Sequence, residues 1–114
     1  MFKIFKLILI CTTIVLFFLK FGYASEKKIK IGLLVPMSGE KNKLGQSIIK
    51  STRLALKDVG VENIEIYPRD TGLDPNKTLR SAIELKKLGI KIVIGPVFFE
   101  NIKYLSEVED IIFL

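Results

Sequence analysis

The sequence has no histidine and a single cysteine, and these two scarcities exclude most chemistry of enzyme sites. Without histidine there is no serine–histidine or cysteine–histidine pair and no imidazole ligand for zinc. Cys11 lies inside an apolar N-terminal run, so the rest of the chain has no thiol for a disulfide, a CxxC redox pair or a thiolate metal site. We therefore expect a binding protein and no enzyme, with no metal and no cofactor.

Motifs that hold nucleotides or cleave sugars are also missing. No GxGxxG follows the first apolar run, no GxxxxGK[ST] occurs anywhere, and no two carboxylates are spaced for glycoside hydrolysis. The lysines are spread along the chain without a block of like charge or interleaved aromatic residues, which argues against nucleic acid as a partner. We interpret the charge as a solvated surface.

The first 24 residues have the pattern of a secretory signal. Lys3 and Lys6 precede an apolar run from Leu7 to Leu19, and small residues at Gly22 and Ala24 favour cleavage after Ala24. The alternative is a membrane anchor, but this run of 13 residues falls short of the ~20 that span a bilayer. The sequence predicts export to the periplasm, with residues 1–24 as signal and 25–114 as the mature segment.

Cleavage would leave a mildly basic segment. Three of the 18 basic residues lie in the signal and all 12 acidic residues follow it, so the net charge falls from +6 to +3. A lipid anchor is not expected, because Ile10 stands before Cys11 where a small residue would be needed. The apolar run Ile111–Leu114 reads as the start of a further strand, so we expect a piece of a longer protein.

Apolar runs and amphipathic stretches alternate through residues 25–114. The expected strands are Ile29–Val35, Ile64–Tyr67 closed by Pro68, Ile90–Ile94 ended by Gly95-Pro96, and one at the last residues. The first helix spans Gly45–Val59 and ends at Gly60. The second starts at Asp74-Pro75 and ends near Leu88, before a left-handed Gly89, burying Leu79, Ala82, Ile83 and Leu88. The third begins near Phe99, with Ile102, Leu105 and Val108 inside.

This order predicts an α/β fold with three layers, αβα. Short connections and right-handed crossovers place the strands in a parallel, flavodoxin-like sheet with strand order 2-1-3-4. The carboxyl ends of strands one and three then lie side by side, where open α/β sheets bind ligands. We expect the loops 36–44 and 95–100 to form one crevice.

The candidate ligand contacts lie in these two loops. Ser38 offers a hydroxyl, Gly39 permits close backbone approach, and Glu100 can pair with a ligand ammonium. Phe98 and Phe99 can form apolar walls, and free amides at a helix start near Phe99 would favour a carboxylate. The alternatives are an ordinary Ser38-Gly39 turn, one phenylalanine in the core, and a first-turn role for Glu100 beside the helix dipole. For Asp70 and Asp74, turn formation and capping are the favoured roles.

Three segments together resemble the type I periplasmic binding proteins, in the branch of the leucine/isoleucine/valine-binding proteins of ABC transporters. They are IKIGLLVPMSG with LGQ, YPRDTGLDPNKTLRSAIELKKLGI, and IVIGP. The resemblance implies that residues 25–114 are part of the N-terminal lobe of a two-lobed protein. It also implies capture of a small ligand, such as an amino acid or another small carboxylate, and its delivery to an ABC permease in the inner membrane.

Two positions depart from that family. Leu44 matches a first-loop residue that is often aromatic and covers the ligand, and Phe99 matches a serine or threonine that holds a carboxylate. The amino-acid ligand is therefore open. GPVFF also resembles the lipoprotein activators of penicillin-binding proteins, which contact a peptidoglycan synthase. The alternative function is thus a periplasmic regulator of cell-wall synthesis, although a lipidated cysteine is missing.

Overall fold

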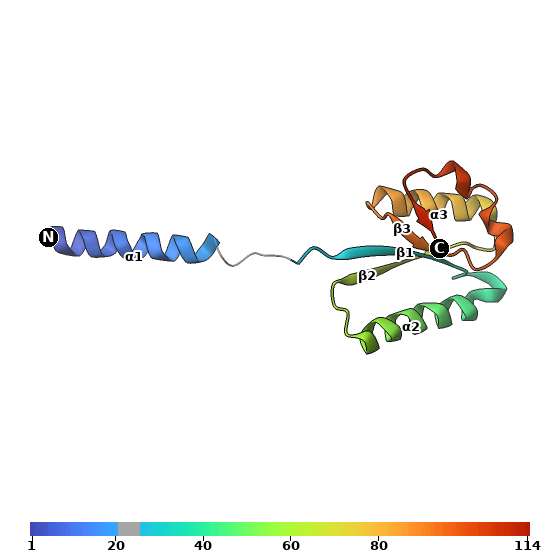
Figure 1. Cartoon of the computed structure of the whole chain (residues 1–114), viewed down its shortest axis with the longest axis horizontal. Coiled ribbons are helices and arrows are strands. Elements are labelled where there is room, and N and C mark those ends of the chain that lie inside the picture. The colour runs from blue at the N-terminus through green and yellow to red at the C-terminus, as the bar shows by residue number, and fades with distance from the viewer. Residues whose placement is uncertain (21–25) are drawn as a thin grey trace.

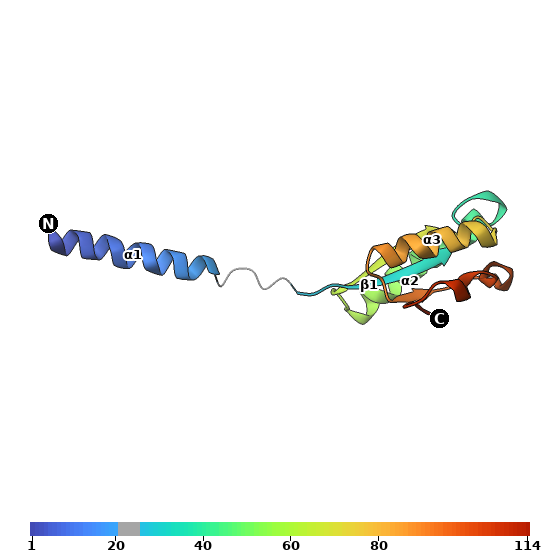
Figure 2. The same cartoon turned by 90° about the horizontal axis from the view of Figure 1, so that it is seen from above.

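A computed structural model describes residues 1–20 and 26–114 of the chain. Helix α1, Phe2–Lys20, includes the apolar run of the predicted signal and lies apart from the α/β unit (Figures 1 and 2). The predicted cleavage after Ala24 falls outside the described residues and stays a prediction. Among the described residues, no helix meets the length and apolarity needed to cross a membrane.

The rest of the chain forms a parallel sheet covered on both faces. Its strands are β1 (Ile29–Val35), β2 (Ile64–Asp70), β3 (Ile92–Ile94) and β4 (Ile112–Phe113), in the order β2-β1-β3-β4. Helix α2, Asn42–Val59, lies on one face and helix α3, Pro75–Lys87, on the other (Figure 1). The predicted α/β class, the three layers and the strand order are confirmed.

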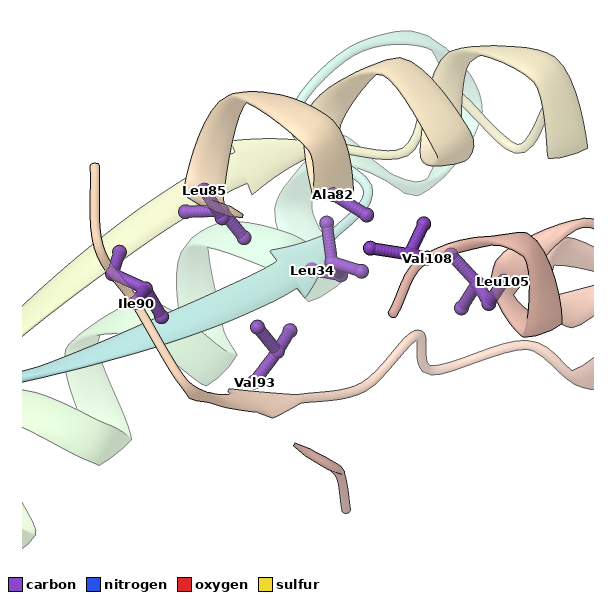
Figure 3. Packing of buried hydrophobic residues seen from close by; sticks show 7 residues of the cluster. All are labelled: Leu34, Ala82, Leu85, Ile90, Val93, Leu105 and Val108. Atoms are coloured by element: carbon purple, nitrogen blue, oxygen red, sulfur yellow. The ribbon is translucent and has the colours of Figure 1, made fainter. Parts of the chain in front are cut away.

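Strand β1 is the centre of the core because alternate side chains point to opposite faces. Leu33 and Val35 pack with Ile49 of α2, and all three are at least nine-tenths buried. Leu34 faces the other way, toward Leu85 of α3 and its neighbours in the second cluster (Figure 3). The carboxyl half of β1 is therefore covered on both sides, which its unbroken apolar run predicted.

The ends of α2 and α3 follow local signals in the sequence. Gly60 is left-handed after α2, with φ 73°, and Gly89 is left-handed after α3, with φ 79°. Asp74 caps α3 by accepting a hydrogen bond from the Asn76 amide at 2.8 Å, and Pro75 is the first helical residue. Helix α2 begins at Asn42, three residues before the predicted start, after a 3-10 turn, η1, at Gly39–Lys41.

The predicted end of β2 at Pro68 is wrong. The strand continues to Asp70, and Pro68 pairs with Leu33 of β1. β2 is the edge strand of the sheet, and an edge strand tolerates proline because one side of its backbone has no partner strand. This extension matters for the site, because it carries Asp70 to the same level as Val35 at the end of β1.

Part of the predicted inner face of α3 is also wrong. Ile83 is 38% exposed and Leu88 is 39% exposed, whereas Leu85 is fully buried. The buried stripe follows Thr78, Ala82 and Leu85, at steps of four and three residues. Ile83 is one residue, about 100° around the helix, from the centre of that stripe.

The third predicted α-helix is replaced by two short 3-10 turns. These are η2, Phe99–Ile102, and η3, Leu105–Glu107. Leu105 and Val108 are buried as expected, but Ile102 is 52% exposed. Apolar residues spaced by exactly three match the 3-10 repeat, and Phe98 provides no side-chain cap. The predicted anion site at a helix start near Phe99 therefore has no α-helix behind it.

Strand β3 also begins later than predicted, at Ile92 instead of Ile90. Ile90 is nevertheless 1% exposed and belongs to the cluster beneath α3 (Figure 3). The Gly95-Pro96 pair ends the strand as expected. The apolar character of Ile90 thus reflects burial in the core without strand pairing.

We expect Asp74→Ala to lower the free energy of unfolding by about 1 kcal/mol, because it removes the acceptor for the Asn76 amide. Urea unfolding followed by circular dichroism would measure the change. Asp58→Ala, at an exposed position in the last turn of α2, is the control and should leave stability within about 0.5 kcal/mol. Equal stabilities for the two variants would contradict the capping role.

Candidate ligand pocket

Three loops enclose a hollow of about 230 Å³ at the carboxyl ends of β1, β2 and β3. Lys41 comes from η1 after β1, and Leu73 comes from the turn between β2 and α3. Phe98, Glu100 and Asn101 come from the segment after β3. The crevice predicted between the first and third loops is thus present, with the second loop as an additional wall.

A larger hollow of about 550 Å³ borders β4 and η3. Its side chains are mainly apolar, and Ser106 supplies the one hydroxyl among them. The smaller pocket, by contrast, brings a cation, a carboxylate, an amide and two apolar side chains together. Specific binding of a small polar ligand needs such a combination, so we take the smaller pocket as the candidate site.

Asp70 joins two of the three loops. One carboxylate oxygen, Oδ1, accepts the Met37 amide at 2.7 Å and the Gly72 amide at 2.9 Å. The other, Oδ2, accepts the Ser38 hydroxyl at 2.6 Å and the Lys77 ammonium at 2.8 Å. The loop after β1 and the turn after β2 are therefore tied to one side chain at the end of β2.

These contacts also set the protonation of Asp70. Burial alone would raise the pKa of the carboxyl, but the hydrogen bonds from Lys77, Ser38, Met37 and Gly72 outweigh burial and hold the pKa well below its usual range. The carboxylate is thus ionised at neutral pH. Because the Ser38 hydroxyl donates its proton to Asp70, Ser38 meets any ligand as a hydrogen-bond acceptor.

Three polar groups of the pocket are uncommitted. The Asn101 side chain is 2% exposed, and its Nδ2 lacks a hydrogen-bond partner within the described part of the chain. Neither Lys41 nor Glu100 forms an ion pair with another described residue. A buried amide without an acceptor costs free energy that a bound acceptor recovers. The pocket can therefore offer a ligand one cation, one carboxylate and one amide donor.

The predicted site residues are only partly brought together. Phe98 and Glu100 line the pocket, Ser38 contacts Asp70, and Gly39 is left-handed at the start of η1. Leu44 is 40% exposed and Phe99 is 75% exposed, and neither lines the pocket. The ligand roles of these residues stay predictions.

Sequence reasoning missed three lining residues. Lys41 lies inside the predicted first loop, but its residue type does not distinguish it from the other exposed lysines, and Asn101 falls in the predicted third helix. Leu73 has a positive φ of 55°, which nothing in its residue type indicates. In the described ranges, 1–20 and 26–114, no three acidic, cysteine or histidine side chains are grouped so that they could hold a metal ion.

Comparisons with known proteins show which solved structures share this fold. No family model and no curated protein matches the chain. A solute-binding protein of an ABC transporter from Rhodopseudomonas palustris, in complex with 3,4-dihydroxybenzoic acid, matches 61% of this chain and 21% of its own at 31% identity, with a TM-score of 0.56. A leucine-binding protein, LivK, from Thermotoga maritima matches 64% of this chain and 22% of its own at 21% identity, with a TM-score of 0.57.

A second kind of protein shares the fold. The C-domain of LpoA from Haemophilus influenzae, a regulator of PBP1A, matches 74% of this chain and 26% of its own at 25% identity, with a TM-score of 0.61. The chain thus spans about a fifth to a quarter of the length of these three solved proteins.

The α/β unit has the fold of a periplasmic-binding-protein lobe, which confirms the predicted architecture. The proteins with this fold that match the chain include ABC solute-binding proteins and a regulator of PBP1A, and none of those named above is an enzyme. A relationship to leucine-binding proteins in particular is not shown, since the identity with LivK is 21%.

Proposed function

We propose that this chain belongs to an exported solute-binding protein of an ABC-type uptake system, which captures a small polar ligand and delivers it to an inner-membrane permease. The observation that carries the proposal is the pocket where the loops after β1, β2 and β3 meet. It combines uncommitted charges at Lys41 and Glu100 with the unpaired amide of Asn101. Lys41 and Glu100 are exposed to solvent and the Asn101 Nδ2 is buried, so a bound ligand would give the amide an acceptor and the two charges a partner.

The residues favour a small carboxylate that also carries a hydrogen-bond donor. Lys41 supplies charge for the carboxylate, Glu100 accepts from an ammonium or hydroxyl group, and Phe98 and Leu73 contact the apolar body. The binding of 3,4-dihydroxybenzoic acid by one structural neighbour supports this ligand class. In the complete protein a second lobe would close over the pocket, and the ligand would shift the population toward the closed state.

A thermal-shift experiment on the complete protein, including the second lobe, tests the proposal. Leucine and 3,4-dihydroxybenzoate, each titrated to millimolar concentration, are the first probes, and the other amino acids follow. A ligand present at 100 times its Kd adds about 2.7 kcal/mol, which would raise the melting temperature by several degrees. No stabilisation by any small carboxylate would contradict the solute-binding proposal.

Lys41→Gln should raise the Kd of the carboxylate identified in this way by roughly tenfold, the effect of losing one charge-assisted contact. Lys43→Gln is the matched control, because Lys43 is an exposed lysine two residues away that does not line the pocket. The two variants should unfold at the same temperature without ligand. Equal affinities would remove Lys41 from the site.

The second candidate function is regulation of cell-wall synthesis through contact with a penicillin-binding protein. The LpoA C-domain supports it, since that match covers 74% of this chain with a TM-score of 0.61, against 61% and 0.56 for the Rhodopseudomonas palustris protein. Measuring the affinity of the complete protein for an immobilised penicillin-binding protein would separate the two functions. Tight binding of the synthase together with no small-molecule stabilisation would support the regulator.

A further inference from the structure

The outer face of α2 carries a row of positive charge. Lys43, Lys50 and Lys57 are seven residues apart, so they lie nearly in line along the helix, and Arg53 lies beside them. All four are exposed, whereas the helix buries Gly45 and Ile49 on its inner side, next to Arg53. At 1.5 Å per residue the row is about 21 Å long. In the sequence the same residues appear scattered, and only the helical repeat gathers them.

The row is not neutralised within the protein. Asp58 is the one acidic residue of α2, and no ion pair among the described residues includes any of the four cations. On α3, by contrast, Lys77 pairs with Asp70 at 2.8 Å and Lys86 pairs with Asp110 at 4.0 Å. A solvated helix face usually mixes the two signs of charge. Four cations with Asp58 as the one acid beside them leave an excess of positive charge, which favours an anionic partner.

An exposed apolar side chain stands within the row. Leu54 is 58% exposed and lies on the outer face, between Lys50 and Lys57. Basic residues around an apolar one are typical of helices that lie on lipid headgroups. A straight row on a convex helix complements a flat, negatively charged surface.

We propose that the outer face of α2 docks on anionic phospholipid headgroups. Lys43, Lys50, Arg53 and Lys57 contact the phosphates, and Leu54 enters the interface between them. The proposal is independent of the ligand pocket, because none of these five residues lines it. It would keep the α/β unit at the membrane surface whether or not α1 is removed.

Lysine footprinting of the full chain tests this directly. The chain is mixed with vesicles of pure phosphatidylcholine or with vesicles that contain one third phosphatidylglycerol, and acetylation of each lysine is read by mass spectrometry. Helix α1 is present in both samples, so the comparison isolates the effect of lipid charge. Lys43, Lys50 and Lys57 should react at least threefold more slowly with the anionic vesicles, and 0.5 M NaCl should abolish the protection.

Lys27, Lys87 and Lys91 are the internal controls, because they are exposed lysines outside α2 whose side chains form no ion pair within the described part of the chain. Their reactivity should be the same with both lipids. The triple variant Lys43→Gln/Lys50→Gln/Lys57→Gln should weaken the salt-sensitive binding to anionic vesicles by roughly tenfold or more. The control triple Lys27→Gln/Lys87→Gln/Lys91→Gln, which has the same net charge, should retain it.

Three results would overturn the proposal. Equal reactivity of the row in both lipids would identify it as a solvated face. Equal loss of binding in the two triple variants would show that net charge alone acts, without the row. Protection by poly-L-glutamate together with none by anionic vesicles would assign the row to an acidic protein partner.

Discussion

Replacing Gly45 with alanine is expected to destabilise the α/β unit by about 3 kcal/mol or more. Gly45 is in the first turn of α2, where the helix passes over the end of β1. A Cβ atom at this position would overlap the carbonyl oxygen of Pro36, and Pro36 is itself fully buried. Because the obstacle is backbone, no side-chain rotation relieves it. Urea unfolding followed by circular dichroism would measure the loss.

Gly39→Ala is the matched control. Gly39 is also near the end of β1 and has a positive φ of 74°, but a Cβ there meets no atom within 4 Å. Its substitution should cost only about 1 kcal/mol, the strain of a left-handed alanine. If the two variants were equally stable, the close packing of α2 on Pro36 would not exist in solution.

Asp70→Asn is expected to lower the free energy of unfolding by about 2 kcal/mol at pH 7. Asparagine retains one acceptor oxygen but loses the charge, so the four donors that share the carboxylate cannot all be satisfied. The loops that carry Lys41 and Leu73 should also loosen, because Asp70 ties them together. Faster amide exchange at Met37 and Gly72 would report this.

The same variant should change the pH dependence of stability. The pKa of Asp70 is lowered by folding, so its contribution is fully present above the unfolded pKa, near 4, and is lost as the pH falls further. The native protein should therefore lose stability faster than Asp70→Asn between pH 5 and pH 3. Parallel stability curves for the two proteins would show that Asp70 is not stabilised in the folded state.

Much of the fold could be predicted because its signals are local. Asp74 and Pro75 mark the start of α3, Gly60 and Gly89 mark helix ends, and the apolar run of β1 indicates a buried strand. The segment after Phe98 could not be predicted in this way, since apolar residues at steps of three suit both an α-helix and 3-10 turns. Its packing against α3, through Leu105 and Val108, selects the turns.

The candidate site was predicted by position more than by residue. Strands one and three are neighbours in the sheet and their connections leave toward opposite faces, so the loops after them meet at one edge. This position predicts that Phe98 and Glu100 lie at the site. Lys41 and Asn101 depend on where η1 and η2 begin and end, and those boundaries are set by contacts across the sheet. Leu73 lines the pocket with a positive φ of 55°, a backbone conformation that is not expected for leucine.

By itself the sequence determined the α/β class and the absence of histidine and thiol chemistry from residues 25–114, because composition and local periodicity are enough for these. It also predicted the strand order, because short connections with right-handed crossovers leave few arrangements of a parallel sheet. The tertiary structure alone decided that Asp70 accepts from Met37 and Ser38, more than thirty residues earlier, and so shapes the pocket. It also decided that scattered lysines form one row on α2. Both depend on which residues the folded chain brings side by side in space, and spacing along the chain does not contain that information.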